Sequence, residues 1–221
     1  MLTVDKETEA LCNLTVERMK PYVPDANNSK QAAALMALAG ITTAEQANKD
    51  VLSVGGSKNF STFYGYYMLE AKAQAGDYQG AIDVIREYWG AMLDLGATTF
   101  WEDFNMEWVP NASRIDELVP AGKVDIHGDY GAYCYVGFRH SLCHGWASGP
   151  TAWLTEHVLG IKVVGAGSKI IKVTPHLGDL TFAEGTFPTP YGLVKVKHTK
   201  LANGKIKSEI SKPKQVKIVR K

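Results

Sequence analysis

The hydrophobic pattern of this 221-residue chain changes its period near residue 161, and this change constrains the fold more than any other feature. Upstream, apolar residues recur at helical spacing, most clearly in the set Phe60, Phe63, Tyr64, Tyr67, Met68, Ala71 and Ala75. Downstream, apolar and polar residues alternate in short segments at 171–173, 193–197, 206–210 and 216–218. The first pattern suits helices and the second suits strands. The sequence therefore predicts a helical domain at 1–160 and a β domain at 161–221.

The helical part is predicted to contain about six helices joined by short turns. Leu11, Leu14 and Met19 are expected to face inward in the first of them. Gly76 separates two strongly periodic helices, which we expect to pack as an antiparallel hairpin. The expected spans, in chain order, are 5–20, 29–39, 42–52, 60–75, 78–95 and 147–159.

Residues that can cap a helix stand at three of these predicted starts. Asn28 or Ser29 precedes the second helix, and Asp77 precedes the fifth. Thr42 and Glu45 have the spacing of a capping box for the third helix. In the β part, the pair Asn203–Gly204 favours a tight hairpin turn between two strands. The simplest arrangement of these short strands is a small β-sandwich, so the predicted fold is mainly α with a C-terminal β domain.

The net charge of +1 conceals a strong difference between the two parts of the chain. Residues 162–221 hold twelve Lys and one Arg against three acidic residues, so they carry +10 and residues 1–161 carry −9. Such a split can indicate a polyanionic partner. A solvated strand face is the favoured interpretation, because Lys alternates there with Val and Ile and protects strands against edge pairing. We expect no nucleic-acid partner.

Three cysteines, Cys12, Cys134 and Cys143, are too few for a disulfide framework, and we expect free thiols. The first residues contain no apolar core of a signal peptide, and no apolar run approaches the roughly 20 residues of a membrane span. We therefore expect a soluble chain without a membrane partner, and its localisation stays open.

The segment from Gly96 to Trp146 loses periodicity and gathers Trp, Tyr, His and Asp, which is typical of a functional loop. Glu102 follows Thr, Phe and Trp, and a carboxylate beside apolar rings can acquire the raised pKa that proton transfer needs. A surface carboxylate at the end of a helix is the simpler explanation of the same spacing. Asp103 and Glu107 are neighbours that could replace Glu102 in a catalytic role.

Histidines and tryptophans supply the other candidate groups. His140, Cys143 and His144 lack the paired spacing of a metal site, so we expect no metal and no cofactor. His144 can donate a hydrogen bond to a hydroxyl ligand or serve the structure. Trp89 and Trp153 lie in predicted helices and are expected to be packing residues. Three tryptophans lie in the loop region, where they could stack on a sugar: Trp101, Trp108 and Trp146.

Several spaced motifs resemble the α-L-rhamnosidases of glycoside hydrolase family 78. They are Gly96-Ala-Thr-Thr-Phe-Trp-Glu102, Ser141-Leu-Cys-His144-Gly-Trp146, Trp153-Leu followed by Val158-Leu-Gly-Ile161, Val173-Thr-Pro-His-Leu-Gly178 and Pro188-Thr-Pro-Tyr-Gly192. The helical segment 59–70 also fits the family. The resemblance covers most of the chain from about residue 55 onward, in the order that the family has.

The resemblance implies a six-hairpin (α/α)6 toroid followed by a β-sandwich, and an inverting hydrolase that removes terminal α-L-rhamnose from glycosides or plant polysaccharides. Glu102 would be the general base. The implied substrate-binding residues are Trp101, His144, Trp108, Trp146, His127 and Tyr130. The chain holds only about half of the toroid helices, and residues 1–54 match nothing of the segment that carries the family's general acid. The implied chain is therefore a C-terminal portion of such an enzyme.

A half toroid leaves apolar helix faces uncovered, which predicts association with the missing N-terminal half or with a second copy. The family often acts in the periplasm or outside the cell. Two other functions fit the residues. One is a carbohydrate-binding or structural module that does not cleave sugar. The other is a different enzyme of the toroid class, such as a glucuronyl hydrolase or a lyase, which would abstract a proton with Tyr or His.

Overall fold

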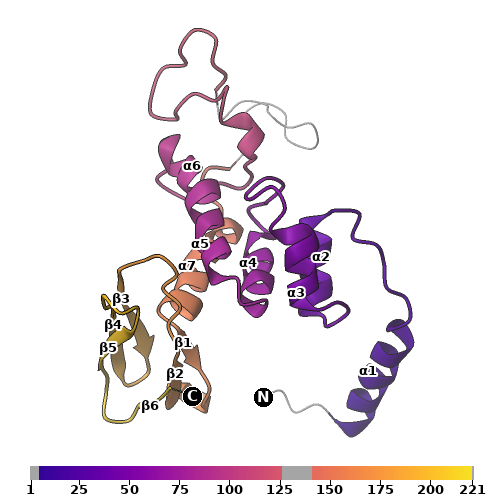
Figure 1. Cartoon of the computed structure of the whole chain (residues 1–221), viewed down its shortest axis with the longest axis vertical. Coiled ribbons are helices and arrows are strands. Elements are labelled where there is room, and N and C mark those ends of the chain that lie inside the picture. Colours follow the sequence, from indigo (N-terminus) through magenta and orange to yellow (C-terminus); the bar gives the residue numbers. More distant parts are fainter. Residues whose placement is uncertain (1–4, 126–140, 221) are drawn as a thin grey trace.

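The computed structural model describes residues 5–125 and 141–220. Helices α2 to α7 form one group, and the strands lie together at one end of it (Figure 1). Helix α1 (Lys6–Met19) lies apart from this group (Figure 1). No helix in the described ranges combines the length and the apolar character that a membrane crossing requires. The expectation of a mainly α chain that ends in strands is confirmed in this coarse form.

The helical part contains α-helices that are extended in three places by a turn of π-helix. These turns span Asn48–Leu52, Ile85–Trp89 and Leu154–Val158, and each continues an α-helix, so the predicted spans 42–52, 78–95 and 147–159 are confirmed. Short 3₁₀ turns cover Met106–Trp108, Gly145–Ser148 and Ala166–Ser168. The α-helices after α1 are α2 Lys30–Leu38, α3 Ala44–Ala47, α4 Gly65–Gln74, α5 Tyr78–Val84, α6 Gly90–Asp94 and α7 Gly149–Trp153.

Side-chain caps start the helices close to the predicted positions. Ser29 Oγ accepts from the backbone of Ala32 at the start of α2, and Asp77 accepts from Gly80 at the start of α5. The predicted cap at Thr42 is wrong by one residue, because Thr43 Oγ1 accepts from the backbone of Gln46 and starts α3. Each cap satisfies a backbone N–H that has no partner within its helix.

The core of the helical part is built from α2, α4, α5, α6 and α7, with Leu52, Met68, Tyr88 and Trp153 fully buried. The inward faces that the sequence predicts differ at two helices. In α1, the predicted inward residues Leu11, Leu14 and Met19 are exposed, because α1 buries no residue in this chain. In the predicted span 60–75, Phe63 and Tyr67 are exposed as well. Helix α4 starts only at Gly65, so residues 60–64 do not share its helical spacing.

A buried ion pair ties the helices together near the start of α5. Lys72 is only 1% exposed, and its Nζ donates to Asp77 Oδ2 at 2.7 Å. The same Nζ donates to Ser53 Oγ at 2.8 Å and to Asn48 Oδ1 at 3.2 Å. These partners replace the water that a buried ammonium group loses.

The β part contains two three-stranded sheets. One has the order β1-β2-β6, with β1 (Ile161–Val163) antiparallel and β6 (Lys217–Val219) parallel to β2 (Ile170–Val173). The other is an antiparallel meander of β3 (Phe182–Thr189), β4 (Gly192–Lys200) and β5 (Ile206–Ser211). The hairpin predicted at 203–204 is confirmed between β4 and β5. Strand β3 does not appear among the sequence-based predictions.

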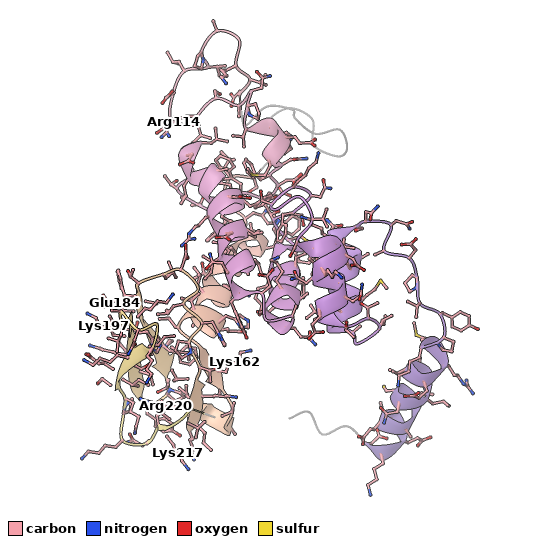
Figure 2. The ribbon with its side chains drawn as sticks, in the orientation of Figure 1. Arg114, Lys162, Glu184, Lys197, Lys217 and Arg220 are labelled. Atoms are coloured by element: carbon pink, nitrogen blue, oxygen red, sulfur yellow. The ribbon has the colours of Figure 1, made fainter. Side chains whose placement is uncertain are left out.

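Buried residues of both sheets belong to one hydrophobic cluster, which includes Ile171, Val173, Val194, Val196 and Val216. The opposite face of the meander is exposed and carries mixed charge. Its register sets Lys197 between Glu184 and Glu209 on the neighbouring strands, and Lys197 Nζ lies 3.5 Å from Glu184 Oε2 (Figure 2). On this face, carboxylates partly neutralise the positive charge of the lysines, which agrees with the interpretation of a solvated strand face.

Candidate functional site

Glu102 is held by two hydrogen bonds to one residue, Ser141, which lies 39 positions further along the chain. The backbone N–H of Glu102 donates to the carbonyl of Ser141 at 2.8 Å. The backbone N–H of Ser141 returns a bond of 2.9 Å to Glu102 Oε2. The Glu102 side chain is only 12% exposed. The carboxylate therefore has a fixed position at the edge of the helical core.

The carbonyl of Glu102 is fixed as well. Thr62, which is buried, donates to it through Oγ1, and Trp146 donates to it through Nε1 at 2.7 Å. The chain before α4 and the 3₁₀ turn at Gly145–Ser148 thus meet at the peptide of Glu102. Neither Thr62 nor Ser141 was identified from the sequence as a residue of the site, since each lies about forty positions from Glu102.

His144 lies beside the carboxylate. Its Nδ1 is 3.9 Å from Glu102 Oε2, and its side chain is 32% exposed. The backbone N–H of His144 donates to the carbonyl of Phe100 at 2.8 Å, which continues the pairing of segments 100–102 and 141–144. The imidazole also contacts the ring of Trp146, at 4.1 Å between centroids. The structure thus brings together Glu102, His144 and Trp146 from the predicted set.

An exposed aromatic surface lies next to this carboxylate and consists of Phe63, Tyr67 and Trp146. Each ring is between 36% and 42% exposed. The Phe63 ring lies 5.5 Å from the Trp146 ring and 6.1 Å from the Tyr67 ring, centroid to centroid. Rings that stay half exposed near a fixed carboxylate can stack on the apolar face of a sugar. The sequence pattern does not single out Phe63 and Tyr67 as members of this surface, because they share the helical spacing of buried residues such as Met68.

The other predicted aromatic residues lie deeper. Trp101 is 0% exposed and packs edge-on against Phe104, at 5.8 Å between centroids. A ring with no accessible face cannot stack on a ligand, so the structure does not place Trp101 where it could stack on a sugar. Trp108 is half-buried and also packs against Phe104. Trp89 and Trp153 are buried and donate to backbone carbonyls, as expected of packing residues.

Two residues of the predicted site, His127 and Tyr130, lie outside the described residues, as do Cys134 and His140. Of the possible substitutes for Glu102, Asp103 accepts a hydrogen bond from the backbone of Phe104, and Glu107 is an exposed partner of Lys58. Glu102 therefore has the environment that best suits proton transfer, because its carboxylate is shielded, fixed and next to an imidazole.

Comparison with known proteins supports the sequence-based resemblance. Residues 160–219 match the family model described as the bacterial alpha-L-rhamnosidase C-terminal domain. No curated protein matches the chain. Among solved structures, the chain is similar to the GH78 family rhamnosidase of Bacillus sp. GL1, with 27% identity and a TM-score of 0.65 over 87% of this chain and 19% of that one.

Two further structures show the same fold. An α-L-rhamnosidase from Aspergillus terreus has 20% identity and a TM-score of 0.72 over 96% of this chain and 24% of its own length. An α-L-rhamnosidase from Streptomyces avermitilis, solved with L-rhamnose, has 19% identity and a TM-score of 0.64 over 86% and 18%. This chain spans about a fifth of the length of each of these relatives. The motifs, the family model and these structures agree that the chain resembles part of a glycoside hydrolase family 78 α-L-rhamnosidase, including the C-terminal domain of that family.

Proposed function

We propose that this chain is the part of an inverting α-L-rhamnosidase that supplies the general base, Glu102. The observation that carries the proposal is the fixed, shielded carboxylate of Glu102, set between Ser141 and His144 beside the exposed rings of Trp146 and Phe63. The similarity to the Bacillus rhamnosidase supports the same assignment.

In the proposed reaction, the Glu102 carboxylate removes a proton from a water molecule while the water oxygen attacks the anomeric carbon of rhamnose. The bond between that carbon and the glycosidic oxygen breaks, and a second carboxylic acid gives its proton to the leaving oxygen. Attack from the face opposite the leaving group inverts the anomeric carbon. The two carboxyl groups must stand about 6.5–9.5 Å apart to admit the water. We propose that the acid belongs to the rest of the enzyme.

The neighbours of Glu102 have distinct proposed roles. His144 holds a sugar hydroxyl, because its half-exposed imidazole lies beside the base. Trp146 stacks on the sugar ring, and its indole N–H keeps the Glu102 peptide in place at the same time. His127, Tyr130 and Trp108 remain proposed substrate contacts of the surrounding loop.

The architecture of the proposed enzyme follows the family. Residues 1–160 would form part of an (α/α)6 toroid, and residues 161–221 would form the β-sandwich, consistent with the shared hydrophobic cluster of the two sheets. The proposed substrate is a rhamnose-containing glycoside or plant polysaccharide. The proposed protein partner is the remainder of the toroid or a second copy of the chain.

The test compares hydrolysis of an aryl α-L-rhamnoside by the chain and by its Glu102→Gln variant, together with binding of L-rhamnose by saturation-transfer NMR. Turnover that disappears in the variant, with rhamnose still bound, identifies Glu102 as the base. Asp103→Asn is the matched control and should keep the activity of the unmodified chain.

Binding of rhamnose without turnover by either chain would agree with a part that keeps the base and lacks the acid. A carbohydrate-binding module, in contrast, would stay inactive after the half that carries the general acid is added. Turnover that survives in Glu102→Gln would contradict the proposed role of Glu102. It would assign proton removal to a group other than Glu102.

A further inference from the structure

A second cluster of chemically reactive side chains lies in the helical part and plays no role in the proposed reaction. It consists of Glu70 on α4 and of Glu156 and His157 on the π-helical turn that follows α7. One ligand atom from each of the three lies within 4.8 Å of the others. His157 is 6% exposed, and its Nε2 lies 2.7 Å from Glu70 Oε1. We propose that Glu70, Glu156 and His157 together bind one Zn²⁺ ion.

The ligand atoms of the cluster determine which metal ions it can bind. An imidazole nitrogen with two carboxylate oxygens suits zinc and other late transition metals, whereas calcium and magnesium prefer oxygen ligands alone. Zinc commonly takes three protein ligands and a water molecule, at about 2.0–2.2 Å from the ion. In a tetrahedral site, two such ligand atoms stand about 3.3–3.6 Å apart. The ligand atoms of the cluster lie within 4.8 Å of one another, and His157 Nε2 lies 2.7 Å from Glu70 Oε1, so the Glu side chains must move by roughly 1 Å to enclose an ion.

An ion pair between His157 and Glu70 explains the positions of these two residues but not the position of Glu156. Within the described ranges, no basic nitrogen lies within ion-pair distance of the Glu156 carboxylate, although it stands next to that of Glu70. Burial, together with the charges of Glu70 and Glu156, raises the pKa of the nearby Tyr66 to about 12. Two neighbouring carboxylates repel each other, and a divalent ion between them would remove that repulsion.

The cluster is accessible to an ion. Glu70, Glu156 and His157 line a pocket of about 600 Å³ between the helices and the first sheet, with Tyr78 and His176 also in its wall. The rings of Tyr78 and His176 stack at 3.6 Å between centroids, which fixes that side of the pocket. The opening leaves room for water or a small anion as the fourth ligand.

Two lysines of the first sheet also line the pocket. Lys162 on β1 and Lys172 on β2 stand directly opposite each other across the two strands. Figure 2 shows Lys162 where the strands meet the helices. Both ammonium groups repel a bound cation, so they should hold the affinity for zinc below that of a site without them. An effect of these lysines on the affinity for zinc would therefore distinguish this site from zinc that binds to thiols elsewhere in the chain.

The test is calorimetric titration of ZnCl₂ into the metal-free 221-residue chain, in a background with all three cysteines replaced by Ser. The proposal expects one Zn²⁺ per chain. Glu156→Gln should weaken the affinity at least tenfold, and Lys162→Gln should strengthen it severalfold. Glu209→Gln, which removes an exposed carboxylate on β5, is the matched control and should leave the affinity unchanged.

Thermal unfolding supplies a second measurement. Zinc should raise the Tm of the chain and should raise it far less in Glu156→Gln, whose circular dichroism without metal checks that the variant folds. No binding, equal affinity in Glu156→Gln, or equal affinity for Mg²⁺ and Zn²⁺ would overturn the proposal.

Discussion

At the scale of single residues, Glu102 shows how a shielded carboxylate acquires a fixed direction. Its N–H and one carboxylate oxygen bond to the backbone of Ser141, and its carbonyl accepts from Thr62 and Trp146. Three of these hydrogen bonds hold the backbone of Glu102, and the fourth, from the N–H of Ser141 to Oε2, restricts the rotation of the side chain. A general base held in this way loses little entropy when substrate binds.

The buried pair of Lys72 and Asp77 carries a prediction for stability. Lys72→Met removes the ammonium group and leaves Asp77, Asn48 and Ser53 without their shared partner. We expect a loss of about 3 kcal/mol in the free energy of unfolding, as measured by urea denaturation. Lys58→Met, which breaks an exposed ion pair with Glu107, should cost about 0–1 kcal/mol. Equal losses of unfolding free energy in the two variants would show that the buried ion pair of Lys72 does not stabilise the fold.

Asp77 also makes stability depend on pH. Burial opposes its charge, but hydrogen bonds from Lys72 and Asn48 outweigh this effect and lower the pKa of Asp77 from 3.8 to about 2. A lowered pKa means that the contribution of Asp77 is complete above its unfolded value and disappears as the pH falls from about 4 to 2. The difference in unfolding free energy between the unmodified chain and Asp77→Asn should therefore shrink in this range. A difference that is constant from pH 6 to pH 2.5 would contradict the assignment.

The sequence identified the chemical groups of the site better than their supports. Glu102, His144 and Trp146 could be found because their residue types suit sugar chemistry and they stand in short motifs. Thr62 and Ser141 were not recognised, although Ser141 stands in the same motif as His144, because only the folded chain brings them to Glu102. Trp101 was expected at the surface, although its large apolar ring is fully buried.

At the scale of elements, Gly160 decides how the last helix passes into the first strand. Its φ is +68°, and a Cβ at this position would lie 2.2 Å from the backbone of Thr174. The carbonyl of Gly160 accepts from the N–H of Thr174 at 2.9 Å, so the two backbones must stay this close. The residue therefore needs both a left-handed backbone and the absence of a side chain.

Gly160→Ala should lower the free energy of unfolding by more than about 1–3 kcal/mol, which is the cost of a left-handed backbone alone. Gly76→Ala is the matched control, because its φ is +78° and a Cβ there meets nothing within 4 Å. The two variants should be compared by urea denaturation. The excess cost at Gly160 measures the contact with Thr174, and a cost no greater than that at Gly76 would mean that the turn can relax.

Sequence patterns predicted helices better than strands in this chain, for reasons that particular residues show. Caps such as Ser29 and Asp77 mark helix starts through local hydrogen bonds, which depend on near neighbours only. Strand β3 contains Gly185 and Pro188, which weaken any strand signal. Its pairing with β4 and the hydrophobic cluster below it decide that it forms a strand, and neither can be seen locally.

At the scale of the whole molecule, α1 is the helix whose apolar residues stay exposed without packing on the rest of the described chain. Helix α1 buries none of its residues, and Leu11, Leu14, Val16 and Met19 are each about half exposed or more. Helical propensity and the Asp5 cap can form this helix, but most helical stability in proteins comes from a packed apolar face. We therefore predict that these exposed residues of α1 contact another polypeptide.

Deletion of residues 1–24 tests this expectation. Sedimentation velocity should show concentration-dependent association of the full chain, and the deleted chain should remain monomeric. Its Tm at low concentration should not change, because α1 buries nothing. A lower Tm after deletion would show that α1 packs against its own chain, and an unchanged degree of association would assign the contact to another surface.

The two hydrogen bonds between Glu102 and Ser141 have a further consequence for how such a site can vary. They close a loop of 39 positions, and the entropy of closing a loop grows only with the logarithm of its length. Doubling that length would cost only about 0.6 kcal/mol. Insertions between the two residues could therefore lengthen the intervening segment while Glu102 and Ser141 stay paired. The two hydrogen bonds keep the position of Glu102 constant, whereas the length and sequence of the segment between Glu102 and Ser141 can vary.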